Sequence, residues 1–128
     1  MIDHISYAVT DYARSRAFYD AALAPLGYRP TMEFGRVTGY GDNGAPQFWI
    51  SAEGDPAEAV GRSRGFHIAF RAPDRAAVNA FHLAALAHGG RDNGAPGVRS
   101  HYHPDYYAAF VFDPDGYRIE AVCRRPHP

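Results

Sequence analysis

The sequence contains no lysine, so all thirteen basic residues are arginine. Schiff-base chemistry and a P-loop each need a lysine amine, and both are therefore excluded. The one cysteine, Cys123, excludes an internal disulfide framework. The first residues lack a basic segment followed by an apolar one, and no apolar run approaches about eighteen residues. We therefore expect a cytoplasmic protein without a membrane segment.

Charge of one sign is also scarce. The net charge is −1, and acidic and basic residues are interspersed along the 128 residues. Nucleic acids and anionic membranes select a basic face, so neither is expected as a partner. The length and the ordinary apolar content predict one compact domain over residues 1–128.

A shift of 63 residues aligns the two halves of the chain. The identical pairs include histidine, aspartate, phenylalanine and glycine as well as several alanines, which chance matching of alanines does not explain. The most informative pairs are His4 with His67, Ile5 with Ile68, Asp11 with Asp74, Phe18 with Phe81 and Gly27 with Gly90. A fixed offset of this kind indicates a duplicated structural unit.

Each half has the same predicted order of elements. Alternating apolar residues predict strands at 2–9 and 66–72. Asp11 and Asp74 are typical helix N-caps, and Gly27 and Gly90 are expected to end the helices, on which His82 and His88 are expected to be solvated. Three further strands are expected near 29–35, 36–41 and 47–52, and again near 98–103, 107–113 and 117–123. Asp-Asn-Gly-Ala-Pro, at 42–46 and 92–96, predicts a turn at both places.

The fold class is therefore α+β, built from two βαβββ modules. The first module covers about 1–53, the second about 66–123, and a linker of about 54–65 joins them. The last residues, 124–128, are interpreted as a frayed end.

Strand alternation puts three possible metal ligands on equivalent faces. Ile5, Tyr7 and Val9 alternate with His4, and the apolar residues of the other two strands alternate in the same way with His67 and Glu120. All three side chains are thus expected on the face turned away from the helices. Two histidines and one carboxylate leave coordination positions open for a substrate.

The motifs that carry these residues resemble the vicinal oxygen chelate superfamily of glyoxalases, bleomycin-resistance proteins and extradiol dioxygenases. The resemblance covers roughly residues 2–123 and rests on His4-Ile5, on Phe66-His67-Ile68, and on the stretch from Phe112 through Asp-Pro-Asp-Gly to Ile119-Glu120. It implies an open, metal-centred barrel with one divalent Fe, Mn, Ni or Zn ion at His4, His67 and Glu120. It also implies a small-molecule substrate and a homodimer, with the site formed either within one chain or across two.

Further site candidates lie on neighbouring strands and loops. Glyoxalase I has a fourth ligand on the last strand of the first module, where Gln47 and Trp49 stand here; Gln47 is the possible ligand, and a polar residue at a strand start is the simpler interpretation. The segment 99–107 is rich in histidine, tyrosine and arginine, and forms either a pocket wall or a surface loop. We assign catalytic roles there to His101 and Tyr107. Substrate contacts are assigned to Trp49, Gln47, Arg71, His103 and Tyr106.

Two functions remain open from the sequence. One is a metal-dependent lyase, isomerase or dioxygenase that chelates vicinal oxygens of its substrate. The other is a metal-free protein, similar to the bleomycin-resistance proteins, that sequesters an aromatic drug or metabolite in a cleft with aromatic walls.

Overall fold

The first module folds as one helix against a four-stranded sheet. The computed structural model describes residues 1–53 and 65–127, so the expected linker lies almost entirely outside the described residues. The elements of the first module are β1 (Ile5–Ala8), α1 (Tyr12–Leu23), the short 3-10 helix η1 (Ala24–Leu26), β2 (Arg29–Phe34), β3 (Val37–Gly41) and β4 (Phe48–Ser51). The strand order is β1-β4-β3-β2, with β1 parallel to β4 and the other pairs antiparallel.

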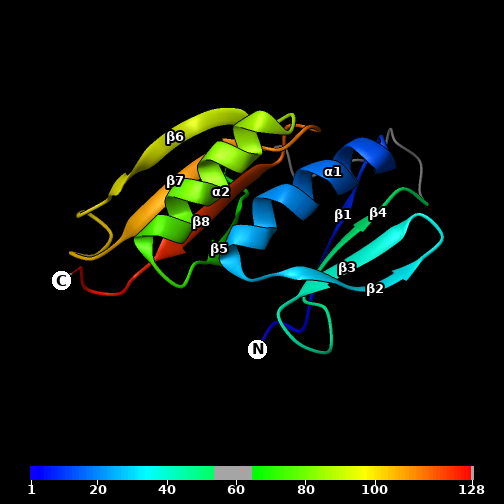
Figure 1. Cartoon of the computed structure of the whole chain (residues 1–128), viewed down its shortest axis with the longest axis horizontal. Coiled ribbons are helices and arrows are strands. Elements are labelled where there is room, and N and C mark those ends of the chain that lie inside the picture. Colours follow the sequence, from blue (N-terminus) through cyan, green and yellow to red (C-terminus); the bar gives the residue numbers. More distant parts are fainter. Residues whose placement is uncertain (54–64, 128) are drawn as a thin grey trace.

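The second module repeats this arrangement, which confirms the predicted fold class. Its elements are β5 (Ile68–Arg71), α2 (Arg75–Ala87), β6 (Arg91–Val98), β7 (Tyr107–Phe112) and β8 (Arg118–Cys123), and the strand order is β5-β8-β7-β6. Figure 1 shows the two helices side by side, each running along its own sheet. Among the described residues, no helix combines the length and the apolar character needed to cross a membrane.

The helices begin at the predicted N-caps. A carboxylate oxygen of Asp11 accepts a hydrogen bond from the backbone N–H of Arg14, and Asp74 accepts one from Ala77 at 2.8 Å. Each bond satisfies one of the backbone donors that a helix leaves unpaired in its first turn. Gly27 was predicted to end the first helix, and it caps η1 in the left-handed conformation, with φ of +91°. After the second helix it is Gly89, with φ of +98°, and not the predicted Gly90, that adopts this conformation.

The edge strand β6 corrects two predictions. We expected a turn at 92–96 and a strand near 98–103, but the strand is Arg91–Val98 and contains the whole second Asp-Asn-Gly-Ala-Pro segment. The first copy, at 42–46, does lie in a loop between β3 and β4. At the edge of the sheet a proline costs no ladder hydrogen bond, and two register shifts around Gly94 accommodate the irregular residues.

One core joins the two modules. The rings of Tyr7 and Tyr117 stack with centroids 4.1 Å apart, and the Tyr117 hydroxyl donates to the carbonyl oxygen of Ala8 at 2.7 Å. Phe48 meets Phe70 edge to face at 5.2 Å. Because these contacts join the first module to the second, they fix the position of one sheet relative to the other.

Candidate functional site

Glu120 lies in the middle of the second sheet, on the face turned away from α2. In β8 the side chains of Ile119, Ala121 and Cys123 belong to the core, so Glu120 points the other way. Its register partners are Ala69 on β5 and Phe110 on β7. We call this side of the second sheet its open face; it carries His67, Ala69, Arg71, Arg118, Glu120 and Val122.

Two side chains hold the Glu120 carboxylate, which is only 1% exposed. Nε2 of His67 lies 3.1 Å from Oε1, and the hydroxyl of Tyr106 donates a hydrogen bond to Oε2. A buried carboxylate is costly unless it is paired or hydrogen-bonded, and here each oxygen has a partner. The His67 side chain is 47% exposed, so the pair connects the interior of the sheet with the surface.

Tyr106 acts as a donor because its hydroxyl keeps its proton. Burial, and then the hydrogen bond and negative charge of Glu120, raise the pKa of Tyr106 to about 12. The guanidinium group of Arg124 lies over the same ring, 4.9 Å from its centroid. Tyr106 thus links Glu120 to a cation just after β8.

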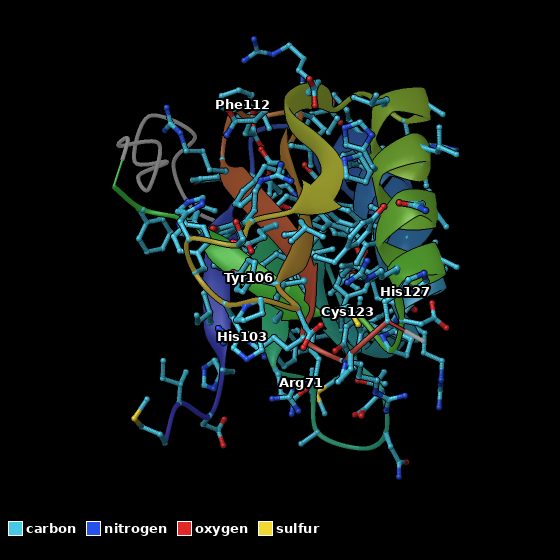
Figure 2. The ribbon with its side chains drawn as sticks, turned by 90° about the vertical axis from the view of Figure 1, so that its left-hand side faces the viewer. Arg71, His103, Tyr106, Phe112, Cys123 and His127 are labelled. Atoms are coloured by element: carbon cyan, nitrogen blue, oxygen red, sulfur yellow. The ribbon has the colours of Figure 1, made fainter. Side chains whose placement is uncertain are left out.

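A cavity of about 710 Å³ adjoins this pair on the open face. It is lined by open-face residues of β5 and β8, by Tyr106 and by the C-terminal residues: Ala69, Arg71, Ala72, Pro73, Tyr106, Val122, Arg124, Arg125 and Pro126. Figure 2 shows Tyr106, His103 and Arg71 from this side of the molecule. Residues 124–127, expected as part of a frayed end, are exposed and belong to no helix or strand, and Arg124, Arg125 and Pro126 contribute to the cavity wall.

The second histidine predicted as a ligand lies elsewhere in the chain. His4 precedes β1, and its Nδ1 is 2.7 Å from Oδ1 of Asp3. It lines a smaller cavity of about 230 Å³ on the first sheet, together with Phe34 and Trp49. Within the described ranges, no group of three or more His, Cys, Asp or Glu side chains is arranged to hold a metal ion. The structure therefore brings His67 and Glu120 together within one chain, without His4.

Gln47, the possible fourth ligand, lines neither of these two cavities, but its own cavity shares Ala69 and Arg71 with the larger one. It is exposed and lines a cavity of about 150 Å³ between the modules, together with Phe48, Phe70 and Arg71. Its backbone is held between two strands, since its N–H donates to Tyr40 and its carbonyl oxygen accepts from Ile5.

The aromatic and histidine-rich segment divides between the two faces of the sheet. Tyr107 points toward α2, where its hydroxyl donates to Oδ1 of Asn79 at 2.6 Å, so it lies on the opposite side from Glu120. His101 is exposed and packs on Tyr102, and Nδ1 of His103 accepts the backbone N–H of Asp105 at 3.0 Å. Of the two neighbouring tyrosines, Tyr106 is the one in contact with Glu120.

A strand pattern in the sequence could have separated the two tyrosines. Tyr107, Ala109 and Val111 alternate as one apolar set, and Tyr107 pairs with the core residue Cys123. The residue before such a strand falls on the other face. No comparable sequence pattern indicated that the arginines after β8 line a cavity.

Comparison with known proteins agrees with this architecture. Residues 1–121 match the family described as the glyoxalase/bleomycin resistance protein/dioxygenase superfamily. The chain belongs to this superfamily. A solved glyoxalase/bleomycin resistance protein from Albidiferax ferrireducens is 33% identical, with 96% of this chain and 97% of that chain covered and a TM-score of 0.81.

More distant superfamily structures share the fold. A family enzyme from Burkholderia phytofirmans is 17% identical, covering 97% and 98% of the two chains with a TM-score of 0.68. The fosfomycin resistance protein FosX from Listeria monocytogenes is 18% identical, covering 94% and 89% with a TM-score of 0.67. No curated protein matches the chain. Superfamily members typically use a divalent metal, commonly bind small molecules and are often dimeric.

Proposed function

We propose that this superfamily member is a metal-dependent enzyme that chelates vicinal oxygens of a small substrate. The metal would be held by His67 and Glu120 of one chain and by His4, most simply from a second copy. The single observation that carries the proposal is the contact between His67 and Glu120, because it joins an imidazole to a buried carboxylate whose other partner, Tyr106, lines the cavity of about 710 Å³.

The donor pair fits a divalent metal. An imidazole nitrogen and a carboxylate oxygen are both ligands that a divalent metal ion would take. Nε2 of His67 and Oε1 of Glu120 are 3.1 Å apart. Tyr106 supports the carboxylate from the other side, as hydrogen-bonding partners of metal ligands commonly do.

The symmetry of the chain supports His4 as the third ligand. His4 and His67 are equivalent in the repeat, and each immediately precedes the first strand of its module. The His4 cavity borders Phe34, which is 58% exposed, and Met32 on the same edge strand is exposed as well. Exposed apolar residues around a ligand favour a covering partner, and a homodimer would bring His4 of one copy to the open face of the other.

When bound, a divalent metal supplies Lewis acidity that stabilises a substrate enediolate or oxyanion, or activates dioxygen if the metal is iron. The chain's own residues orient the ligands. Tyr106 keeps its proton and fixes Oε2 of Glu120, which leaves Oε1 for coordination. Nδ1 of His103 accepts a backbone N–H, so its neutral ring carries the proton at Nε2 and is able to donate it to a substrate oxygen.

The second candidate is a metal-free binding protein for an aromatic drug or metabolite. Two observations favour it: within the described part of one chain the third ligand is missing from the His67–Glu120 pair, and Trp49 and Phe34 offer an aromatic surface at the His4 cavity, with ring centroids 5.9 Å apart. Isomerisation, ring cleavage and thiol addition fit the enzyme proposal equally well, since fold alone does not select a reaction.

Metal content measured by elemental mass spectrometry tests the proposal. The parent protein is expected to hold close to one Fe, Mn, Ni or Zn ion per chain, and the His67→Ala and Glu120→Gln variants are expected to lose it. His88→Ala is the matched control, because His88 is exposed and its Nδ1 lies 2.8 Å from the carbonyl oxygen of Ala84 on its own helix. A parent protein that contains no metal and takes none up would refute the enzyme proposal and favour the binding protein.

A further inference from the structure

Three arginines line the cavity of about 710 Å³ next to Tyr106. Arg71, Arg124 and Arg125 contribute to its wall, and among the residues that the structure describes no aspartate or glutamate does. The whole chain carries one net negative charge, so this concentration of cations is local. Within residues 1–53 and 65–127, the ion pairs that arginines make with carboxylates involve Arg14, Arg16 and Arg36, and none involves the three cavity arginines.

Hydrogen bonds on both sides hold the backbone at Arg71. It is the last residue of β5, in register with Val122 of β8, and its side chain belongs to the open face. Its carbonyl oxygen accepts a hydrogen bond from the Tyr28 hydroxyl at 2.8 Å, and the next residue, Ala72, donates to Val122 at the same distance. The backbone of Arg71 is therefore held by both modules, which restricts where its guanidinium group is able to reach.

Arg124 connects the cavity to the proposed metal site. Its guanidinium group lies over the Tyr106 ring, and the hydroxyl of that ring contacts Glu120. A planar guanidinium group recognises carboxylate and phosphate oxygens through two parallel hydrogen bonds.

We propose that this cavity is an anion-binding subsite in which Arg71 and Arg124 hold a carboxylate or phosphonate group of a small organic molecule, with Arg125 adding charge. Combined with the proposed function, on which this step rests, the substrate class is an organic anion whose neighbouring oxygens reach the His67–Glu120 pair. The anionic group anchors the molecule, and Tyr106 separates the anchor from the oxygens that are to be chelated.

Titration of benzoate, phenylphosphonate and neutral benzamide into metal-stripped protein, at constant ionic strength, tests the subsite. Calorimetry is expected to show binding of at least one of the two anions, about tenfold tighter than that of benzamide, because a charge-assisted hydrogen bond is lost in the amide. Which anion binds more tightly distinguishes a carboxylate site from a phosphonate site. Equal binding of benzamide and both anions would overturn the proposal.

Arginine variants locate the binding. Arg71→Gln and Arg124→Gln are each expected to weaken anion binding about tenfold. Arg36→Gln is the control: it removes the same charge from an exposed arginine that pairs with Glu53 and does not line the cavity. If Arg36→Gln weakens binding as much as the two cavity variants, the effect is one of net charge and the subsite is disproved.

The design separates failure of the subsite from failure of the proposed function. Anion binding is measured without metal, so it survives even if the parent protein proves to be metal-free and the enzyme proposal fails. Conversely, a metal that is lost in Glu120→Gln, combined with no anion binding in the parent, would uphold the metal site and reject the organic anion.

Discussion

The hydroxyl of Tyr106 donates to Oε2 of Glu120 on the side opposite to His67. The carboxylate is thereby fixed between a neutral donor and an imidazole. Tyr106 comes from the loop before β7, whereas Glu120 belongs to β8, so the loop sets the orientation of a strand residue. This loop is the segment 99–106 that connects β6 with β7.

Replacing Tyr106 with phenylalanine is expected to weaken metal binding by about ten- to a hundredfold, as loss of a partner of a metal ligand commonly does. The ring beneath Arg124 remains, and only the hydroxyl is removed. Oε2 of Glu120 would be left buried without its donor. Competition with a chelator of known affinity measures the change.

Tyr107→Phe is the matched control for that variant. It removes the hydroxyl from the neighbouring tyrosine, which donates to Asn79 on the helix side of the same sheet. Metal affinity is expected to stay within about twofold of the parent value, since the interaction it deletes lies away from Glu120. Equal losses in both variants would show that Tyr106 acts through general stability and not through Glu120.

Mixing two variants that each lack one of the two histidine ligands tests whether the proposed metal site is shared between chains. His4→Ala and His67→Ala are each expected to lose metal. In a two-fold dimer with shared sites, a mixed dimer has one site with both histidines intact, so co-refolding equal amounts restores about one quarter of the sites. Elemental analysis of the mixture gives the fraction.

The outcome of the mixing experiment is unambiguous in both directions. If each chain builds its own site, every chain in the mixture lacks one ligand and no metal returns. A mixture that stays empty, with His4→Ala alone lacking metal, would place all ligands in one chain and reject the shared site.

Most of the fold was predicted from the 63-residue repeat in the sequence. Asp11 and Asp74 cap equivalent helices, and strand alternation put His67 and Glu120 on one face, where they are in contact. These predictions held because helix caps and strand alternation are local properties of the chain. The register that joins His67 to Glu120 follows from the parallel pairing of β5 with β8.

Predictions that depended on tertiary packing failed. His82 was expected to be solvated, but it is buried and its Nε2 lies 2.9 Å from Oδ1 of Asp92. That hydrogen bond lowers the pKa of Asp92 and ties α2 to β6, the strand that was predicted to be a turn. Turn chemistry in Asp-Asn-Gly-Ala-Pro was overridden by pairing with β7, which no local pattern reveals.

Gly90→Ala is expected to destabilise the protein by about 1–3 kcal/mol, the usual cost of overpacking. A Cβ at this position would lie 2.7 Å from Cε2 of Phe18 and 2.8 Å from the carbonyl oxygen of Ala85. Phe18 belongs to α1, so the clash acts on the contact between the modules. Urea unfolding measures the change, and Gly65→Ala is the control because a Cβ there meets no atom of the described residues within 4 Å.

Asp113 is expected to make stability depend on pH. Its side chain is buried and accepts hydrogen bonds from the Tyr19 hydroxyl at 2.6 Å and from the backbone N–H groups of Asp115 and Tyr117. Burial outweighs these bonds and raises the pKa of Asp113 from 3.8 to about 6. The folded chain therefore holds this proton more tightly than the unfolded chain does.

The sign of the effect follows from proton linkage. Between about pH 4 and pH 6 the folded state binds more protons at Asp113, so its contribution to the free energy of unfolding falls as the pH rises, by about 2–3 kcal/mol in total, and is level above pH 6. Asp113→Asn abolishes this contribution, whereas the opposite effect of the lowered pKa of Asp92 is common to both proteins. Denaturant unfolding from pH 4 to pH 7 is expected to show the parent losing stability relative to Asp113→Asn. Parallel curves for the two proteins would mean that the Asp113 carboxyl titrates alike in the folded and unfolded chains, with its hydrogen bonds to Tyr19 and the backbone fully offsetting burial.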